Sequence, residues 1–154
     1  MKLRLVCVGK ISEAYLRTGI DDFAGRIGRY LPLTTVELRE EKGGDPRTLR
    51  EREAERILEK LPAAAFVIAL DERGESLNSE GFASLLERHM LHGTPELVLV
   101  IGGPYGLGEA VKRRADLLLS LSAMTFTHQM VRLFLLEQLY RGFTILRREP
   151  YHNR

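Results

Sequence analysis

Apolar and polar residues recur along the chain with two different periods, and these periods mark the predicted elements. Short apolar or alternating runs are typical of β-strands, and the run at 64–70 is apolar at every position. Between the runs, apolar residues recur every three or four positions, as in amphipathic helices. The predicted strands are 2–9, 33–39, 64–70, 96–103 and 116–122. The predicted helices follow Ser12, Asp45 and Ser79, lie near 107–114 and occupy 128–148.

Strands that alternate with helices favour a parallel sheet. The sequence therefore predicts an α/β fold, with a mostly parallel sheet and helices on both faces, in one domain over 1–154. Ser12, Asp45 and Ser79 are each placed to cap a helix, and "DERGES" (71–76) is expected to form a turn. In folds of this kind, ligands bind at the carboxyl ends of the strands.

Composition narrows the class of protein. The 154 residues are 44% hydrophobic and 29% charged, which is ordinary for a soluble globular protein. Apolar runs are too short for a membrane-spanning helix, and the N-terminal run is too short for a secretory signal. The single cysteine, Cys7, excludes an internal disulfide, and its apolar neighbours favour a buried position. We therefore expect a cytoplasmic protein.

The net charge of +2 is small, but it is unevenly distributed. Residues 126–154 carry five arginines and two glutamates, a net charge of +3, whereas 1–125 carry a net charge of −1. The five are Arg132, Arg141, Arg147, Arg148 and Arg154. Arginine is suited to planar contacts with phosphate. A solvated helix end, where the helix dipole favours cations, explains the same charges equally well.

Two loops follow the fourth and fifth predicted strands. "IGGPYGLGE" (101–109) has four glycines, which permit tight turns or close approach of a ligand. Its spacing matches neither the dinucleotide fingerprint nor the P-loop, and a tight crossover is the alternative explanation. "LSLSAMTFTHQM" (119–130) mixes small polar and apolar residues, which suits a pocket for an uncharged flat ring. A plain loop in which Thr127 caps the next helix is the alternative. His128 falls in the first turn of that helix, where the dipole favours a neutral ring.

The last predicted helix is apolar on nearly every side. A helix of this kind is buried all round, so we expect one side to cover its own sheet and the other to meet a second copy in a homodimer. His89 and His92 are spaced to share one helix face. No third ligand accompanies them, so we predict no metal site.

Longer segments resemble a known family. "LVLVIGGPYGLGEAV" and "LSLSAMTFTHQMVRLFLLEQLYRGFTILRREPYH" resemble the RlmH family of SPOUT-class methyltransferases, as do "MKLRLVCVGK" and "IALDERGESLNSEGFA". The likeness covers essentially the whole chain. It implies transfer of a methyl group from S-adenosylmethionine to N3 of a pseudouridine in 23S ribosomal RNA. It also implies a C-terminal trefoil knot, roughly over 97–147, and no separate RNA-binding domain. General topology rules alone favour an unknotted sheet.

The resemblance also implies which residues form the site. The implied cofactor contacts are Leu70, Gly102, Leu121, Ser122, Ala123, Met124, Thr125 and Phe126. The implied substrate-side residues are His128, Arg141, Tyr151 and His152. We expect Arg141 to stabilise negative charge, the other three to position the base, and one histidine to accept the N3 proton. Thr127 and Gly142 depart from the proline and alanine that are commoner in the family.

The end of the chain, "REPYHNR", is an unusual tail because it carries an aromatic ring, an imidazole and a guanidinium. We expect Tyr151 and His152 to complete the active site of the other protomer, and the tail to be mobile until RNA binds. Two other functions stay open. A non-enzymatic ribosome- or RNA-binding module of the same fold would not bind S-adenosylmethionine. A nucleotide-dependent enzyme of Rossmann type would bind NAD or ATP.

Overall fold

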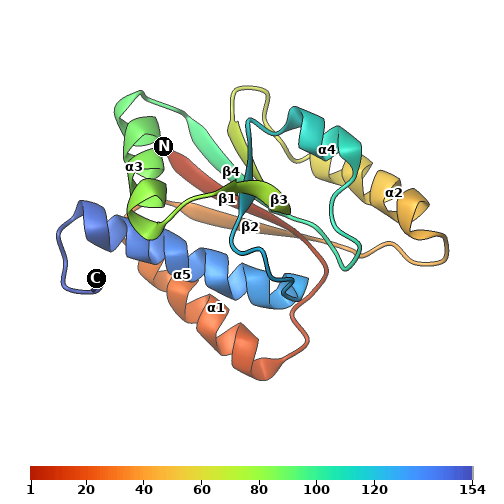
Figure 1. Ribbon diagram of the computed structural model, residues 1–154, viewed down its shortest axis with the longest axis horizontal. Helices are drawn as coiled ribbons and strands as arrows, with labels where there is room; N and C mark the ends of the chain where they lie inside the picture. The colour runs from red at the N-terminus through yellow and green to blue at the C-terminus, as the bar shows by residue number, and fades with distance from the viewer. Residues whose placement is uncertain (154) are drawn as a thin grey trace.

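The computed structural model, which describes residues 1–153, is a five-stranded sheet between two layers of helices (Figure 1). The strands are β1 (Lys2–Val8), β2 (Leu33–Leu38), β3 (Phe66–Ser76), β4 (Glu96–Ile101) and β5 (Leu117–Ser120). The helices are α1 (Ala14–Ile27), α2 (Pro46–Leu58), α3 (Ser79–Leu91), α4 (Glu109–Arg114) and α5 (His128–Leu146). The strand order is β2-β1-β4-β3-β5, and every pair is parallel. The predicted α/β fold is confirmed.

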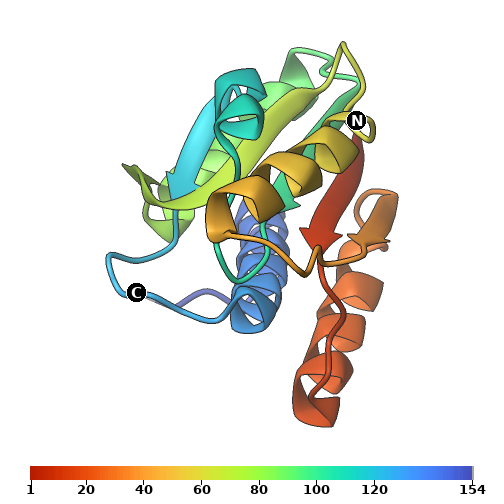
Figure 2. The ribbon, with the colours of Figure 1, turned by 90° about the vertical axis from the view of Figure 1, so that its right-hand side faces the viewer.

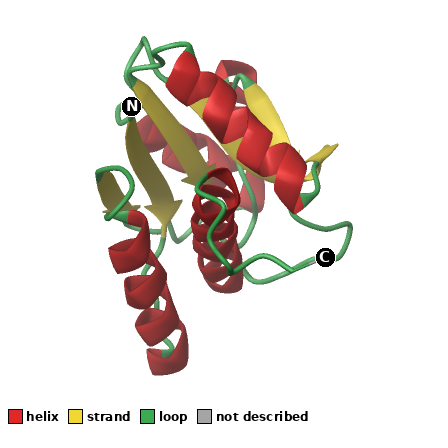
Figure 3. Cartoon of the chain, turned by 90° about the vertical axis from the view of Figure 1, so that its left-hand side faces the viewer, coloured by secondary structure: helices red, strands yellow, loops and turns green. Residues whose placement is uncertain are grey.

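Successive side chains of a strand point to opposite faces of a sheet, so β1 and β4 contribute to two separate apolar clusters. One cluster lies under α1, α3 and α5 and includes Leu3, Leu5, Cys7, Leu97, Leu99 and Ile101. The other lies under α2 and α4 and includes Val6, Val8, Val98 and Val100. Figures 2 and 3 view these layers from opposite sides. The predicted burial of Cys7 and the helices on both faces are confirmed.

β3 runs to Ser76, beyond the predicted end of that strand, so the turn expected at 71–76 is wrong. Leu70 and Glu75 both pair with Leu119 of β5, and the register shifts between them. Residues 71–74 therefore bulge out of the ladder. The pairing with β5, which local sequence does not reveal, makes this polar segment part of the sheet.

Three expected helix caps can be checked. Asp45 caps α2 as predicted, because its carboxylate accepts a hydrogen bond from the backbone N–H of Thr48. The caps predicted at Ser12 and Ser79 are wrong. α1 begins after Glu13 without a side-chain cap, and Asn78 caps α3. Both serine hydroxyls instead bond glutamine side chains on α5, which are far away in sequence.

α5 is the longest helix and lies between α1 and α3 (Figure 1). Its inward face is fully buried and includes Leu135, Leu136, Leu139 and Phe143. Gly142 lets α3 approach closely, since an added Cβ would lie 2.9 Å from Leu86 Cδ1. Across the residues that the structure describes, we find no helix with the length and apolar character needed to cross a membrane.

Candidate active site

The carboxyl ends of β4, β3 and β5 meet at one edge of the sheet, because these three strands are neighbours in the order β4-β3-β5. Ala69 pairs with Val100, and Leu70 pairs with Leu119. Gly102 and the segment 121–126 therefore leave the sheet beside Leu70. The structure thus brings the predicted cofactor residues together, although they come from three separate parts of the chain.

The segment 121–126 is shaped by local hydrogen bonds and tied to the bulge of β3. The backbone N–H of Met124 donates to Ser122 Oγ over 3.0 Å, and Thr125 Oγ1 donates to Glu72 Oε2 over 2.8 Å. Met124 is 74% exposed and Phe126 is 37% exposed. The segment therefore presents apolar side chains to the outside while its own polar groups hold its shape.

The glycine-rich turn after β4 has no room for a side chain at Gly102. A Cβ at Gly102 would lie 2.8 Å from the carbonyl carbon and oxygen of Gly106, and Gly106 has φ +84°. The N–H of Gly106 donates to the carbonyl of Gly103, which closes the turn. Packing of the chain itself thus explains these glycines, as the tight-crossover alternative predicts. Because Gly102 has no side chain, its backbone is left uncovered by a side chain of its own at the edge of the sheet near Leu70.

His128 begins α5, and Thr127 caps the helix by accepting a hydrogen bond from Met130 N–H. The imidazole is half-buried against the end of β1. It lies so close to Gly9 that an added Cβ there would be 3.2 Å from His128 Nε2. Burial lowers the pKa of His128 below its ordinary value; Glu40 opposes this shift and Arg132 adds to it. The ring is therefore neutral at pH 7, as predicted.

The other three substrate-side residues form a cluster at the far end of α5, which we call the tail cluster: Arg141, Tyr151, His152, Glu137 and Glu80. Glu137 Oε1 accepts from Tyr151 OH over 3.0 Å and from the Arg141 guanidinium, whose carbon lies 4.9 Å from the Tyr151 ring centre. His152 contacts Arg141 through Nδ1 over 3.2 Å and Glu80 through Nε2 over 3.3 Å. Burial and the bond to Glu137 raise the pKa of Tyr151.

The docked tail differs from the mobile tail that the sequence led us to expect, because Tyr151 and His152 each have partners on α3 or α5. The tail cluster also lies far from His128. Arg141 lies thirteen positions after His128 on α5, which is roughly 20 Å along the helix axis. In Figure 1 the start of α5 and the C-terminus lie at opposite ends of that helix. One chain therefore unites three of the four predicted substrate-side residues and leaves His128 apart.

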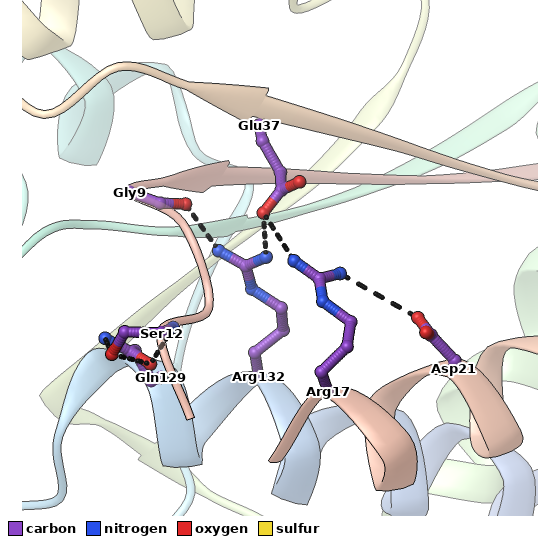
Figure 4. Close-up of polar contacts among 7 residues, drawn as sticks. All are labelled: Gly9, Ser12, Arg17, Asp21, Glu37, Gln129 and Arg132. Atoms are coloured by element: carbon purple, nitrogen blue, oxygen red, sulfur yellow. Dashed lines mark hydrogen bonds and ion pairs between the residues drawn. The ribbon is translucent and has the colours of Figure 1, made fainter. Parts of the chain in front are cut away.

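Arg132 has a role that its sequence context does not reveal, since its charge alone places it among the cations suited to phosphate. Its side chain is only 1% exposed. The guanidinium donates to Glu37 Oε2 over 2.7 Å and to the carbonyl of Gly9 over 2.9 Å (Figure 4). Its place on the inward face of α5, one turn after His128 and beside buried leucines, is the signal that could have revealed it.

Exposed arginines gather elsewhere, in a shallow hollow between the ends of α1 and α5. The hollow is lined by Arg26, Arg29, Tyr30, Tyr140, Arg147 and Glu149. The Arg26 guanidinium lies over the Tyr140 ring, 5.4 Å from its centre, and that of Arg147 lies 5.9 Å from the centre of the Tyr30 ring. Only part of the basic surface therefore comes from the C-terminal segment, since α1 supplies the rest. Arg154 lies outside the described residues.

Comparison with known proteins identifies the family. Residues 1–152 match the family model described as "Predicted SPOUT methyltransferase". The chain is 64% identical over 156 residues to "Ribosomal RNA large subunit methyltransferase H" of Syntrophotalea carbinolica, with 100% of both proteins covered. It is 53% identical to the protein of the same name from Geotalea daltonii, over 99% of this chain and 100% of that one. The chain therefore belongs to the SPOUT methyltransferase family, and the resemblance to RlmH proteins is confirmed.

A solved structure supports the fold independently of these sequence matches. A putative methylase family protein from Neisseria gonorrhoeae superposes with a TM-score of 0.58 over 99% of this chain and 86% of that one. At 13% identity the likeness concerns the fold alone.

Proposed function

We propose that the protein methylates N3 of a pseudouridine in 23S ribosomal RNA, with S-adenosylmethionine as the methyl donor. One observation carries the proposal: the chain is 64% identical, end to end, to a protein named as a large-subunit ribosomal RNA methyltransferase. The proposed substrate is ribosomal RNA, which places the reaction in the cytoplasm. When bound, the cofactor supplies an electrophilic methyl group on a sulfonium.

The carboxyl edge of the sheet is the proposed cofactor site. The proposed contacts are Leu70, Gly102, Leu121, Ser122, Ala123, Met124, Thr125 and Phe126. The residues fit a flat, uncharged ring beside a small polar group, because Gly102 leaves an edge without side chains and segment 121–126 offers exposed apolar side chains together with backbone groups. Their convergence from the ends of β4 and β5 and from Leu70, just before the bulge of β3, supports this assignment.

The substrate side must place N3 in line with the methyl group and help remove the N3 proton, since an imide nitrogen is a good nucleophile only after deprotonation. His128 is a suitable proton acceptor because burial holds its pKa low and keeps the ring neutral. His152 is the alternative acceptor. We assign Arg141 to the negative charge that develops on the base edge. Tyr151, which shares the carboxylate of Glu137 with Arg141, is assigned to positioning.

We further propose a homodimer in which the tail cluster of one protomer meets the His128 end of the other. The outward stripe of α5 supports this arrangement, because it begins with Met130 and Phe134 and continues to Glu137 and Arg141. The ring of Phe126 packs edge to face against the ring of Phe134, with 5.2 Å between the ring centres. In a two-fold dimer that uses this stripe, with the axis perpendicular to α5, opposite ends of the two α5 helices lie side by side. Such pairing removes the separation of roughly 20 Å within one chain.

The RNA surface that we propose combines the exposed arginines of the hollow with the tail. Arg26, Arg29 and Arg147 offer guanidinium groups beside tyrosine rings, which can contact phosphates and stack on bases. Arg132 does not contribute, because it is buried. Binding to ribosomal RNA or ribosomal particles through such contacts weakens steeply as salt concentration rises.

We also infer that the chain is a single domain, 1–154, knotted over roughly 97–147, with no separate RNA-binding domain. β5 lies at the edge of the sheet, yet α5 packs between α1 and α3. The resemblance to the SPOUT family, rather than the order of the strands, supports the knot.

Calorimetric titration of the purified protein with S-adenosylmethionine, NAD and ATP separates the three functions that the sequence left open. We expect binding of S-adenosylmethionine alone. Affinity for NAD or ATP in its place supports a Rossmann-type enzyme, and absence of binding supports a non-enzymatic RNA-binding module. Single-turnover methylation then tests alanine variants of His128, Arg141, Tyr151 and His152. Wild-type rates in all four contradict the site.

A further inference from the structure

We propose that Arg132 is a positioning residue for methyl transfer, because it fixes the end of β1 against the first turn of α5 and so holds His128 in place. The proposal rests on the function proposed above. Arg132 itself lies too deep to touch a substrate, so its effect must pass through its neighbours.

The surroundings of Arg132 show that it joins three elements. It projects from α5 and donates to Glu37 on β2 and to the carbonyl of Gly9, directly after β1. Figure 4 shows the guanidinium between these two acceptors, with Arg17 of α1 approaching the same Glu37 carboxylate. A buried guanidinium that bridges three elements fixes their relative positions, since each bond has a defined direction.

Stability alone does not explain this arrangement. Buried ion pairs are often no more stabilising than apolar side chains of the same size. Within the described residues, Arg132 Nε is also a buried donor without a hydrogen-bond partner. A buried donor without an acceptor destabilises the folded state. The side chain is therefore better explained by what it holds in place.

Arg132 fixes the loop at Gly9, against which the His128 ring packs. Arg132 bonds the carbonyl of Gly9, and the Cα of the same glycine faces His128 Nε2, because an added Cβ would lie 3.2 Å from that atom. Gly9 has φ +94°, a conformation that other residues rarely adopt. The next residues of the loop are also fixed to α5, since Gln129 Oε1 accepts from the backbone N–H and hydroxyl of Ser12. Arg132 and Gln129, from the start of α5, thus hold the loop that contains Gly9 and Ser12 beside the imidazole. We call these contacts the clamp.

The clamp also sets the charge around His128. The charged groups that act on the ring are Glu40, after β2, and Arg132, on its own helix; Glu40 favours the imidazolium and Arg132 disfavours it. Burial acts in the same direction as Arg132. Removal of the guanidinium therefore raises the pKa of His128, and the pH range in which the ring is neutral moves upward.

The test compares Arg132→Met, Arg132→Lys and a matched control, Arg17→Met, which removes the other arginine at Glu37 and leaves Gly9 untouched. NMR titration gives the His128 pKa in the free protein, calorimetry gives S-adenosylmethionine affinity, and single-turnover methylation gives the rate against pH. For Arg132→Met we expect unchanged cofactor affinity, a rate lower by about 10- to 100-fold, and a His128 pKa above that of the wild type. The acid limb of the rate profile moves to higher pH with it.

Arg132→Lys separates geometry from charge. The lysine keeps the cation, so the pKa of His128 stays close to that of the wild type. It cannot reach Glu37 and Gly9 together, so the rate still falls. Arg17→Met is expected to behave as the wild type in every measurement. Wild-type rates in Arg132→Lys overturn the proposal, and this variant decides the matter if Arg132→Met does not fold. An unchanged His128 titration in Arg132→Met also overturns it. That titration needs no methyl transfer, so it tests the clamp even if the proposed reaction is wrong.

Discussion

Mixing two inactive variants tests whether the tail of one protomer completes the active site of the other. If it does, the mixture regains activity. The first variant is His128→Ala, and the second lacks residues 150–154. Each homodimer lacks a complete site. If the tail of one protomer serves the His128 end of the other, a mixed dimer has one complete site, formed by the intact His128 of the truncated chain and the intact tail of the other.

The expected magnitudes follow from geometry and from symmetry. Within one chain, His128 and Arg141 are roughly 20 Å apart, too far to act on one methyl group. Random exchange of equal amounts gives mixed dimers in about half of the population, each with one of two sites complete. Activity should therefore return to about a quarter of the wild-type level.

The truncated chain should still fold. Removal of the tail takes away the bond of Tyr151 to Glu137, its edge-to-face contact with Tyr140 at 4.7 Å, and the contacts of His152 with Arg141 and Glu80. Together these contribute roughly 3–4 kcal/mol, against the 5–15 kcal/mol by which domains are usually stable. Circular dichroism, gel filtration and cofactor calorimetry should each give wild-type behaviour. The assay is single-turnover methylation after joint unfolding and refolding, with each variant refolded alone as the control. Activity of the mixture no higher than that of its parents refutes action in trans, and full activity of the truncated chain refutes any role for the tail.

Three further predictions concern residues inside the fold. Gly102→Ala forces a Cβ onto the Gly106 backbone, and Gly108→Ala forces one to 2.9 Å from the Arg50 carbonyl oxygen; both should lose about 1–3 kcal/mol in denaturant unfolding, but only the first should also lose cofactor affinity in calorimetry. Equal affinity in both removes Gly102 from the site. Gly25→Ala, which meets no atom within 4 Å, should gain about 0.5–1 kcal/mol, whereas Gly142→Ala should gain nothing because α3 blocks it, and an equal gain in both contradicts the packing. Burial raises the pKa of Cys7 to about 12, so a thiol reagent at pH 8 should modify it only after unfolding; rapid labelling of the native protein contradicts that burial.

The sequence predicted the parts of the fold that depend on local pattern. The alternation of apolar runs with segments of helical periodicity was sufficient to predict the five strands, the five helices and the parallel arrangement of the strands. The polar end of β3 could not be predicted in this way, because Glu75 and Ser76 join the sheet only through pairing with β5. Ser12 and Ser79 fit the pattern of helix caps, but tertiary bonds to α5 engage their hydroxyls instead.

Only part of the geometry of the proposed site could be predicted from sequence, for a similar reason. The proposed cofactor residues lie at Leu70 in β3 and after the ends of β4 and β5, so a parallel sheet brings them together once its order is known. Arg132 was misjudged because a cation in sequence is normally a surface group, and its acceptors, Gly9 and Glu37, lie about a hundred positions earlier. The tail was expected to be mobile because chain ends usually are, whereas Tyr151 and His152 find partners on neighbouring helices.

The central claim is the reaction itself, and mass spectrometry of 23S ribosomal RNA tests it most directly. The RNA is taken from a strain that lacks this protein, from its parent, and from the deletion strain supplied with the wild-type gene. The account predicts that one methylated pseudouridine present in the parent is unmethylated in the deletion strain and methylated again after complementation. An identical methylation pattern in parent and deletion strain contradicts it.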